Sequence, residues 1–125
     1  MALLLVSLFI WIRALHAHHS VAASYDTSQT ITVTGVITSV EWRNPHVTMH
    51  FAVKNGDGSV TDWRLEMRGP NALSAAGIDL APLVLGDQVS ASIWTAKDGT
   101  KYGNVRNLVQ PDGRNIDVGD RWPQR

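Results

Sequence analysis

The sequence predicts a small, mostly β protein. Several segments rich in Val, Ile and Thr alternate apolar with polar residues, which is the pattern of half-buried strands. Turn signals such as Asn55-Gly56-Asp57-Gly58 separate these segments, and one stretch of good helix formers lies among them. The 125 residues suffice for one hydrophobic core, so we expect a single domain.

The first two predicted strands are long. Residues 30–42 are crowded with β-branched side chains, and we expect a bulge or bend at Gly35, where the apolar phase changes. Pro45 favours a turn, after which residues 46–54 alternate between an apolar face and a face that carries His46 and His50. Residues 60–67 resume the alternation after a hairpin signal, so the second and third strands are predicted to pair antiparallel.

A single short helix is predicted after the third strand, because residues 70–77 begin with Pro70 and end with Gly77. Further strands are expected at residues 88–96, 104–110 and 115–118. We expect the tryptophans of the strands to pack in the core rather than stack on a ligand, namely Trp42, Trp63 and Trp94. This order of elements matches an OB-like β-barrel of five to six strands with one short helix between strands three and four. A small β-sandwich is the alternative.

The N-terminus indicates export. Residues 2–12 form an apolar run that suits a signal-peptide core and is shorter than the ~20 residues needed to span a bilayer. Ala17 predicts cleavage before His18, with cuts after Ala22 or Ala23 as alternatives. We therefore expect a periplasmic or secreted protein without a membrane span after processing. Its expected parts are a signal peptide (1–17), a polar lead (18–29), the barrel domain (30–118) and a tail (119–125).

Composition and motifs argue against several functions. Lys plus Arg equals Asp plus Glu at 11 each, so no global positive field favours nucleic acid. Cysteine is absent, which removes disulfides, thiol nucleophiles and thiolate metal sites. The sequence also lacks the strained Gly-x-Ser-x-Gly turn that exposes a serine nucleophile. We therefore expect a binding protein rather than an enzyme, with a hydrolase as the weaker alternative.

Four groups of short motifs stand out along the predicted mature chain. They are His18-His19-Ser20, Val40-Glu41-Trp42-Arg43-Asn44-Pro45-His46, Leu65-Glu66 with Pro70-Asn71-Ala72-Leu73, and Gly86-Asp87. Together they resemble the motifs of a family of small exported bacterial proteins catalogued only as a domain of unknown function. The resemblance spans nearly the whole mature chain. It implies secretion and a β-barrel domain, and it implies no activity.

The histidines are the candidate metal ligands, because neutral imidazole is a common ligand and the histidines crowd into two short windows. His46 and His50 share a strand face but lie about 13 Å apart at ~3.3 Å per residue, so this pair alone cannot hold one ion. We expect His18 or His19 to complete a site with His46, since cleavage before His18 leaves an α-amino group and an imidazole on one residue. Nitrogen donors without thiolates favour copper, with zinc bound less tightly.

The outer face of the second and third strands is a further candidate site. Arg64 and Glu66 point away from their apolar neighbours and share this face with His50, so these three residues could bind an anionic or sugar-like ligand. The alternatives are a solvated face with cross-strand ion pairs, or a surface on which another exported protein docks. The sequence therefore favours a small exported binding protein whose ligand is a metal ion, a small molecule or another exported protein.

We predict that the exported protein begins at His18, because Ala17 is the first small residue placed after the apolar core and the residues that follow it. Intact-mass measurement of the exported protein tests this start. A mature chain that begins at Ala23 or Ser24, or an uncut chain, would contradict it and would remove the predicted amino-terminal ligand.

Overall fold

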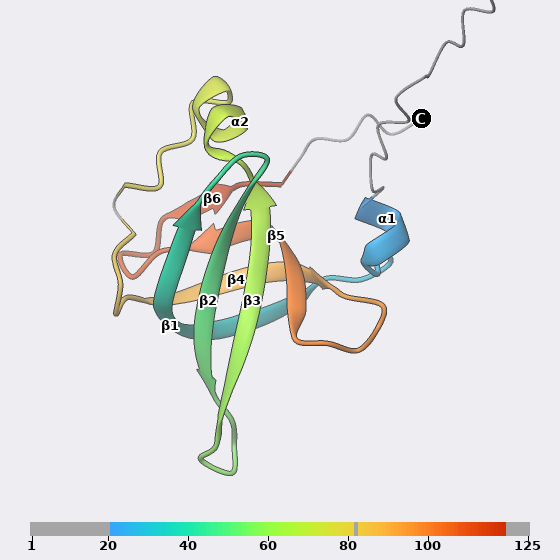
Figure 1. The fold of residues 1–125 in the computed structure, drawn as a ribbon. Coiled ribbons are helices and arrows are strands. Elements are labelled where there is room, and N and C mark those ends of the chain that lie inside the picture. Colours follow the sequence, from blue (N-terminus) through green and yellow to red (C-terminus); the bar gives the residue numbers. More distant parts are fainter. Residues whose placement is uncertain (1–20, 82, 120–125) are drawn as a thin grey trace, which may run out of the picture.

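The computed structural model describes residues 21–81 and 83–119. These residues form a closed β-barrel of five strands with one additional outer strand (Figure 1). The elements are α1 (Val21–Ser24), β1 (Ile31–Trp42), β2 (His46–Lys54), β3 (Val60–Arg68), α2 (Pro70–Ala75), β4 (Gln88–Thr95), β5 (Tyr102–Val109) and β6 (Asn115–Asp117). The predicted mostly β, OB-like architecture is confirmed, and α1 is an additional short helix.

The long strand β1 joins the two halves of the barrel. Its first half pairs antiparallel with β4 and its second half with β2, and Val36 has a partner in both strands. The register shifts between Ile37 and Ser39, where the strand has a bulge or similar irregularity. The predicted break at Gly35 is therefore wrong, because Val33, Gly35 and Ile37 all point inward in one continuous phase while Val36 is exposed.

Gly35 has a different role in β1. A Cβ at this position would lie 3.0 Å from the carbonyl oxygen of Ala52 and 3.0 Å from a methyl carbon of Val53, both on β2. The glycine therefore provides the space that β1 needs as it passes from one partner strand to the other.

The barrel closes between β3 and β5. Residues 64–66 of β3 pair in parallel with residues 102–104 of β5, and β6 pairs with the second half of β5. At the end of β3 the guanidinium of Arg68 donates to the carbonyl oxygens of Val118 and Gly119, at 3.1 and 3.0 Å. These bonds attach the segment that follows β6 to the barrel.

Inward-facing side chains from the five barrel strands fill the interior, and Leu73 of α2 belongs to the same core cluster. The helix α2 lies at one end of the barrel (Figure 1). The fully buried large side chains are Phe51, Ile37, Met49, Leu65, Met67, Ile93, Leu108, Val47, Val89, Val105 and Val118. Within the described ranges, no helix has the length and apolar character needed to cross a membrane.

The expectation that all three strand tryptophans belong to the core is wrong for two of them. Trp63 is half-buried and packs against the core cluster. Trp42, at the end of β1, is 49% exposed. Trp94 lies on the outer face of β4, because the neighbouring Ile93 is buried and successive strand residues point to opposite faces. The guanidinium of Arg106 lies 3.9 Å from the centre of the Trp94 ring.

Gly69 positions the turn that precedes His46. A Cβ at Gly69 would lie 2.5 Å from the carbonyl oxygen of Pro45 and 2.8 Å from the side-chain oxygen of Asn44. That Asn44 oxygen also accepts a hydrogen bond from the backbone N–H of Asn71, at 3.2 Å. The β1–β2 turn is therefore packed tightly against the junction of β3 and α2.

We predict that Gly69→Ala lowers the free energy of unfolding by about 1–3 kcal/mol, because the added methyl group overlaps the backbone of Pro45. Gly56→Ala is the matched control, since nothing lies within 4 Å of a Cβ there, and its effect should stay within about 0.5 kcal/mol. Urea unfolding followed by tryptophan fluorescence measures both variants. Equal stabilities would show that the turn is not constrained in this way.

Candidate functional site

The candidate residues of β2 and β3 lie together on the outer face of the barrel. The antiparallel register places Thr48 opposite Glu66 and His50 opposite Arg64. The alternate residues of both strands, such as Met49 and Leu65, are fully buried in the core. Strand alternation therefore gathers the polar side chains on one surface, as the sequence pattern indicated.

Glu66 holds the ring of His46. Nδ1 of His46 lies 2.5 Å from Oε1 of Glu66. A carboxylate oxygen can only accept, so Nδ1 carries the proton and donates it to Glu66. The lone pair of the neutral ring is then on Nε2, and the His46 side chain is 55% exposed. Metal-binding histidines commonly have this arrangement, in which a carboxylate bonds one ring nitrogen and the other nitrogen takes the metal.

Tyr25 extends this hydrogen-bond chain to the N-terminal lead. Its hydroxyl donates to Oε2 of Glu66 at 2.9 Å, and the residue is 8% exposed. Burial is the main cause that raises the pKa of the Tyr25 hydroxyl above its ordinary value, and the nearby charge of Glu66 is the second. The carboxylate of Glu66 therefore connects the lead with β2.

Backbone contacts attach the lead beside the end of β4. Tyr25 forms a β-bridge with the first residue after β4, and the N–H of Asp26 donates to the carbonyl oxygen of Thr95 at 2.8 Å. The ammonium group of Lys97 donates to the carbonyl oxygen of Ala22 at 2.6 Å. Sequence reasoning missed Tyr25. The available signal was a lone aromatic residue within a polar segment.

His50 has a carboxylate partner of its own. Its Nδ1 lies 2.9 Å from Oδ2 of Asp62, and its side chain is 28% exposed. The cross-strand neighbour of His50 is Arg64, whose guanidinium donates to the hydroxyl of Tyr102 at 3.0 Å and lies 5.2 Å from the centre of that ring. An arginine lies directly across from each histidine, so this charge does not distinguish them. The His46 side chain is the more exposed, at 55% against 28%, and its partner Glu66 also bonds Tyr25 of the lead, so His46 is the better metal ligand of the two.

The remaining predicted ligands, His18 and His19, lie outside the described residues. Within residues 21–81 and 83–119, no group of three His, Cys, Asp or Glu side chains could hold a metal ion. His46 therefore offers one ligand nitrogen, and a complete metal site would need donors from another part of the chain.

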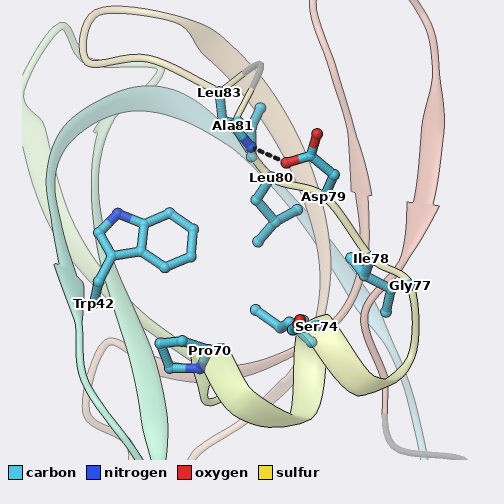
Figure 2. A pocket seen from close by; sticks show the side chains of 10 residues that line it. Trp42, Pro70, Ser74, Gly77, Ile78, Asp79, Leu80, Ala81 and Leu83 are labelled. Atoms are coloured by element: carbon cyan, nitrogen blue, oxygen red, sulfur yellow. Dashed lines mark hydrogen bonds between the residues drawn. The ribbon is translucent and has the colours of Figure 1, made fainter.

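A separate hollow lies at the end of the barrel that α2 covers. Figure 2 shows the ring of Trp42 facing Leu80, with α2 and the loop that follows it forming the other walls. The hollow has a volume of about 660 Å³. Its described lining includes three side chains that can form hydrogen bonds, Trp42, Ser74 and Asp79, and Asp79 already accepts from the N–H of Ala81 at 2.8 Å. This surface is mainly apolar and contains none of the predicted ligand residues.

A family model matches residues 7–106 of the chain. The chain belongs to DUF6152, a family of unknown function. This membership confirms the family resemblance of the sequence motifs. No curated protein matches this chain.

Two solved structures are similar to this DUF6152 protein. One is a crystal structure of Rim1, a mitochondrial single-stranded DNA-binding protein of S. cerevisiae, with 11% identity and a TM-score of 0.50 over 73% of this chain and 96% of that chain. The other is a selenomethionine-labelled crystal structure of the S. cerevisiae protein, with 9% identity and a TM-score of 0.47 over 73% and 97% of the two chains. The first similarity shows the OB-like barrel fold and nothing about function.

We predict that the DUF6152 protein loses stability above about pH 10 and that Tyr25→Phe reduces this loss. Tyrosine in the unfolded chain ionises near pH 10. The pKa of Tyr25 is raised in the folded state, so at higher pH the unfolded chain releases a proton that the folded protein keeps. This contribution to stability is complete below about pH 10 and is lost as the pH rises toward the folded-state pKa.

The measurement is denaturant unfolding of both proteins at pH 9 and pH 11. Between these values the wild type should lose about 1 kcal/mol more than Tyr25→Phe, because only the wild type carries this titrating hydroxyl. Equal losses in the two proteins would show that the environment of Tyr25 does not favour its neutral form.

Proposed function

We propose that this protein is a small periplasmic or secreted binding protein that holds one metal ion, preferably copper, through His46 and its N-terminal histidines. The observation that carries the proposal is the His46–Glu66 pair. It leaves Nε2 of an exposed imidazole with a lone pair, next to the point where the N-terminal lead joins the barrel. The negative charge of Glu66 also favours a cation at this position.

The N-terminal lead is long enough to reach His46. Tyr25 bonds the same carboxylate as His46, so this part of the lead lies close to the His46 ring. Seven residue steps separate His18 from Tyr25. The last four follow α1 and rise about 1.5 Å each, and the first three add about 10 Å when extended, so the segment spans up to roughly 16 Å. The distance therefore does not prevent His18 or His19 from approaching Nε2 of His46.

Cleavage before His18 would supply two nitrogen donors on one residue, the α-amino group and the imidazole. His46 would be the third donor, and His19 could replace either partner. Copper stands above zinc in the affinity order for divalent ions and suits nitrogen ligands in tetragonal geometry. The lack of cysteine in the sequence argues against a thiolate site.

A second role is docking on another exported protein. Large apolar side chains are exposed at one end of the barrel, where Trp42 lines the hollow of Figure 2 and Val84 and Leu85 follow Leu83 of its wall. Exposed apolar groups of this kind often mark interaction surfaces. The outer-face residues His50, Arg64 and Glu66 would contribute polar contacts in this role or hold a small anionic or sugar-like ligand.

We expect neither nucleic-acid binding nor enzymatic activity. Acidic and basic residues are balanced in number, and the similarity to Rim1 concerns the fold. Hydrolysis is the weaker alternative, because a Glu–His pair can serve as a general base only where a nucleophile and an oxyanion site are also at hand.

We predict that protein with its native start binds one Cu²⁺ ion in calorimetry and that His46→Ala weakens this binding at least tenfold. One additional residue before His18 should have a similar effect, because it removes the chelating amino group. Binding should also weaken in acidic solution, because protons compete with the metal ion for the ligand nitrogens.

His50→Ala is the matched control, since it removes an imidazole on the same strand face beside Arg64 and should leave the copper affinity unchanged. Equal affinity in all four proteins would refute the metal site and leave docking as the stronger function.

A further inference from the structure

We infer, resting on the proposed function, that Tyr25 and Glu66 are positioning residues that hold the His46 ring in the tautomer with the proton on Nδ1 and Nε2 presented to a ligand. Neither residue would touch the ligand itself. The two residues come from different parts of the fold, Tyr25 from the N-terminal lead and Glu66 from β3.

Both carboxylate oxygens of Glu66 are engaged. Oε1 accepts from Nδ1 of His46, and Oε2 accepts from the hydroxyl of Tyr25. A carboxylate that is held at one oxygen can still rotate about its terminal torsion, which has a broad energy profile. The second hydrogen bond restricts this rotation, so Tyr25 orients the carboxylate and, through it, the imidazole ring.

Tyr25 is itself held firmly enough for this role. Its ring is buried, and its backbone is anchored beside the end of β4 by the bridge and the Asp26–Thr95 hydrogen bond. Burial raises the pKa of its hydroxyl, so the group remains a hydrogen-bond donor at neutral and moderately alkaline pH.

His50 provides a comparison within the same strand. Its Nδ1 also bonds a carboxylate, but the side chain of Asp62 is 62% exposed, against 29% for Glu66. In the described part of the chain, no second side chain donates to the Asp62 carboxylate. We therefore expect the tautomer of His50 to be less restricted than that of His46.

The test is the tautomer of His46 in the metal-free protein, read from the nitrogen chemical shifts of the ring by NMR at a pH where the ring is neutral. The wild type should show Nδ1 protonated, and Tyr25→Phe should shift His46 toward a mixture of tautomers. Tyr102→Phe is the matched control. It removes a hydroxyl that bonds Arg64 on the same face and that, among the described residues, forms no hydrogen bond with Glu66, so the His46 signals should not change.

Glu66→Gln provides a second route if Tyr25→Phe does not fold. The amide can accept from a protonated Nδ1 through its oxygen or donate to an unprotonated Nδ1 through its NH₂ group. Both tautomers of His46 are then satisfied, so a mixture is expected in this variant as well. A His46 tautomer that stays fixed in the folded variants would overturn the positioning role.

Copper calorimetry of the same proteins separates this role from the proposed function. Tyr25→Phe should weaken copper binding about tenfold, as loss of an outer partner of a metal-binding histidine commonly does, and Tyr102→Phe should not. If the tautomer relaxes in Tyr25→Phe but no protein binds copper, positioning stands and the metal function fails. If wild type and Tyr25→Phe bind copper equally with the same tautomer, positioning fails and the metal function stands.

Discussion

The barrel is held closed by the parallel pairing of β3 with β5. In the sheet order β3-β2-β1-β4-β5-β6, these strands are separated by β2, β1 and β4, and their pairing closes the sheet. Closure creates an inside that the apolar side chains fill. It also brings the end of β4, where Tyr25 is attached, close to Glu66 on β3. In an open sheet the lead and the histidine face would lie far apart.

Glu66 links the N-terminal lead to the candidate ligand His46, because it bonds both Tyr25 and His46. The carboxylate of Asp62 is 62% exposed, so its pair with His50 competes with water and contributes little, as surface ion pairs generally do. The Glu66 carboxylate is less exposed and binds two partners from separate elements, so it constrains both of them. Through Glu66, the position of Tyr25 in the N-terminal lead therefore influences the orientation of the His46 ring on β2.

The barrel of this DUF6152 protein is a scaffold that is also found in Rim1, and such scaffolds carry unrelated functions on their faces and loops. Two surfaces of this chain are candidate binding surfaces. One is the face of β2 and β3 that Tyr25 joins from the lead, and the other is the apolar hollow beside Trp42. The first has hydrogen-bonding groups in a defined geometry, whereas the second offers mainly apolar area.

Neighbours along the chain were enough to predict the strands, the helix bounded by Pro70 and Gly77, and the outward direction of the polar residues of β2 and β3, because alternation and turn residues are local features. The register shift after Ile37 and the attachment of the lead by Tyr25 could not be predicted in this way, because both depend on contacts between distant segments. The structure also shows that Glu66 is the partner of His46, although the register sets Arg68 directly opposite. Alternation leaves several partners within reach on one face. The β2–β3 pairing places Glu66 diagonally across from His46, and barrel closure brings Tyr25 of the lead to the same carboxylate.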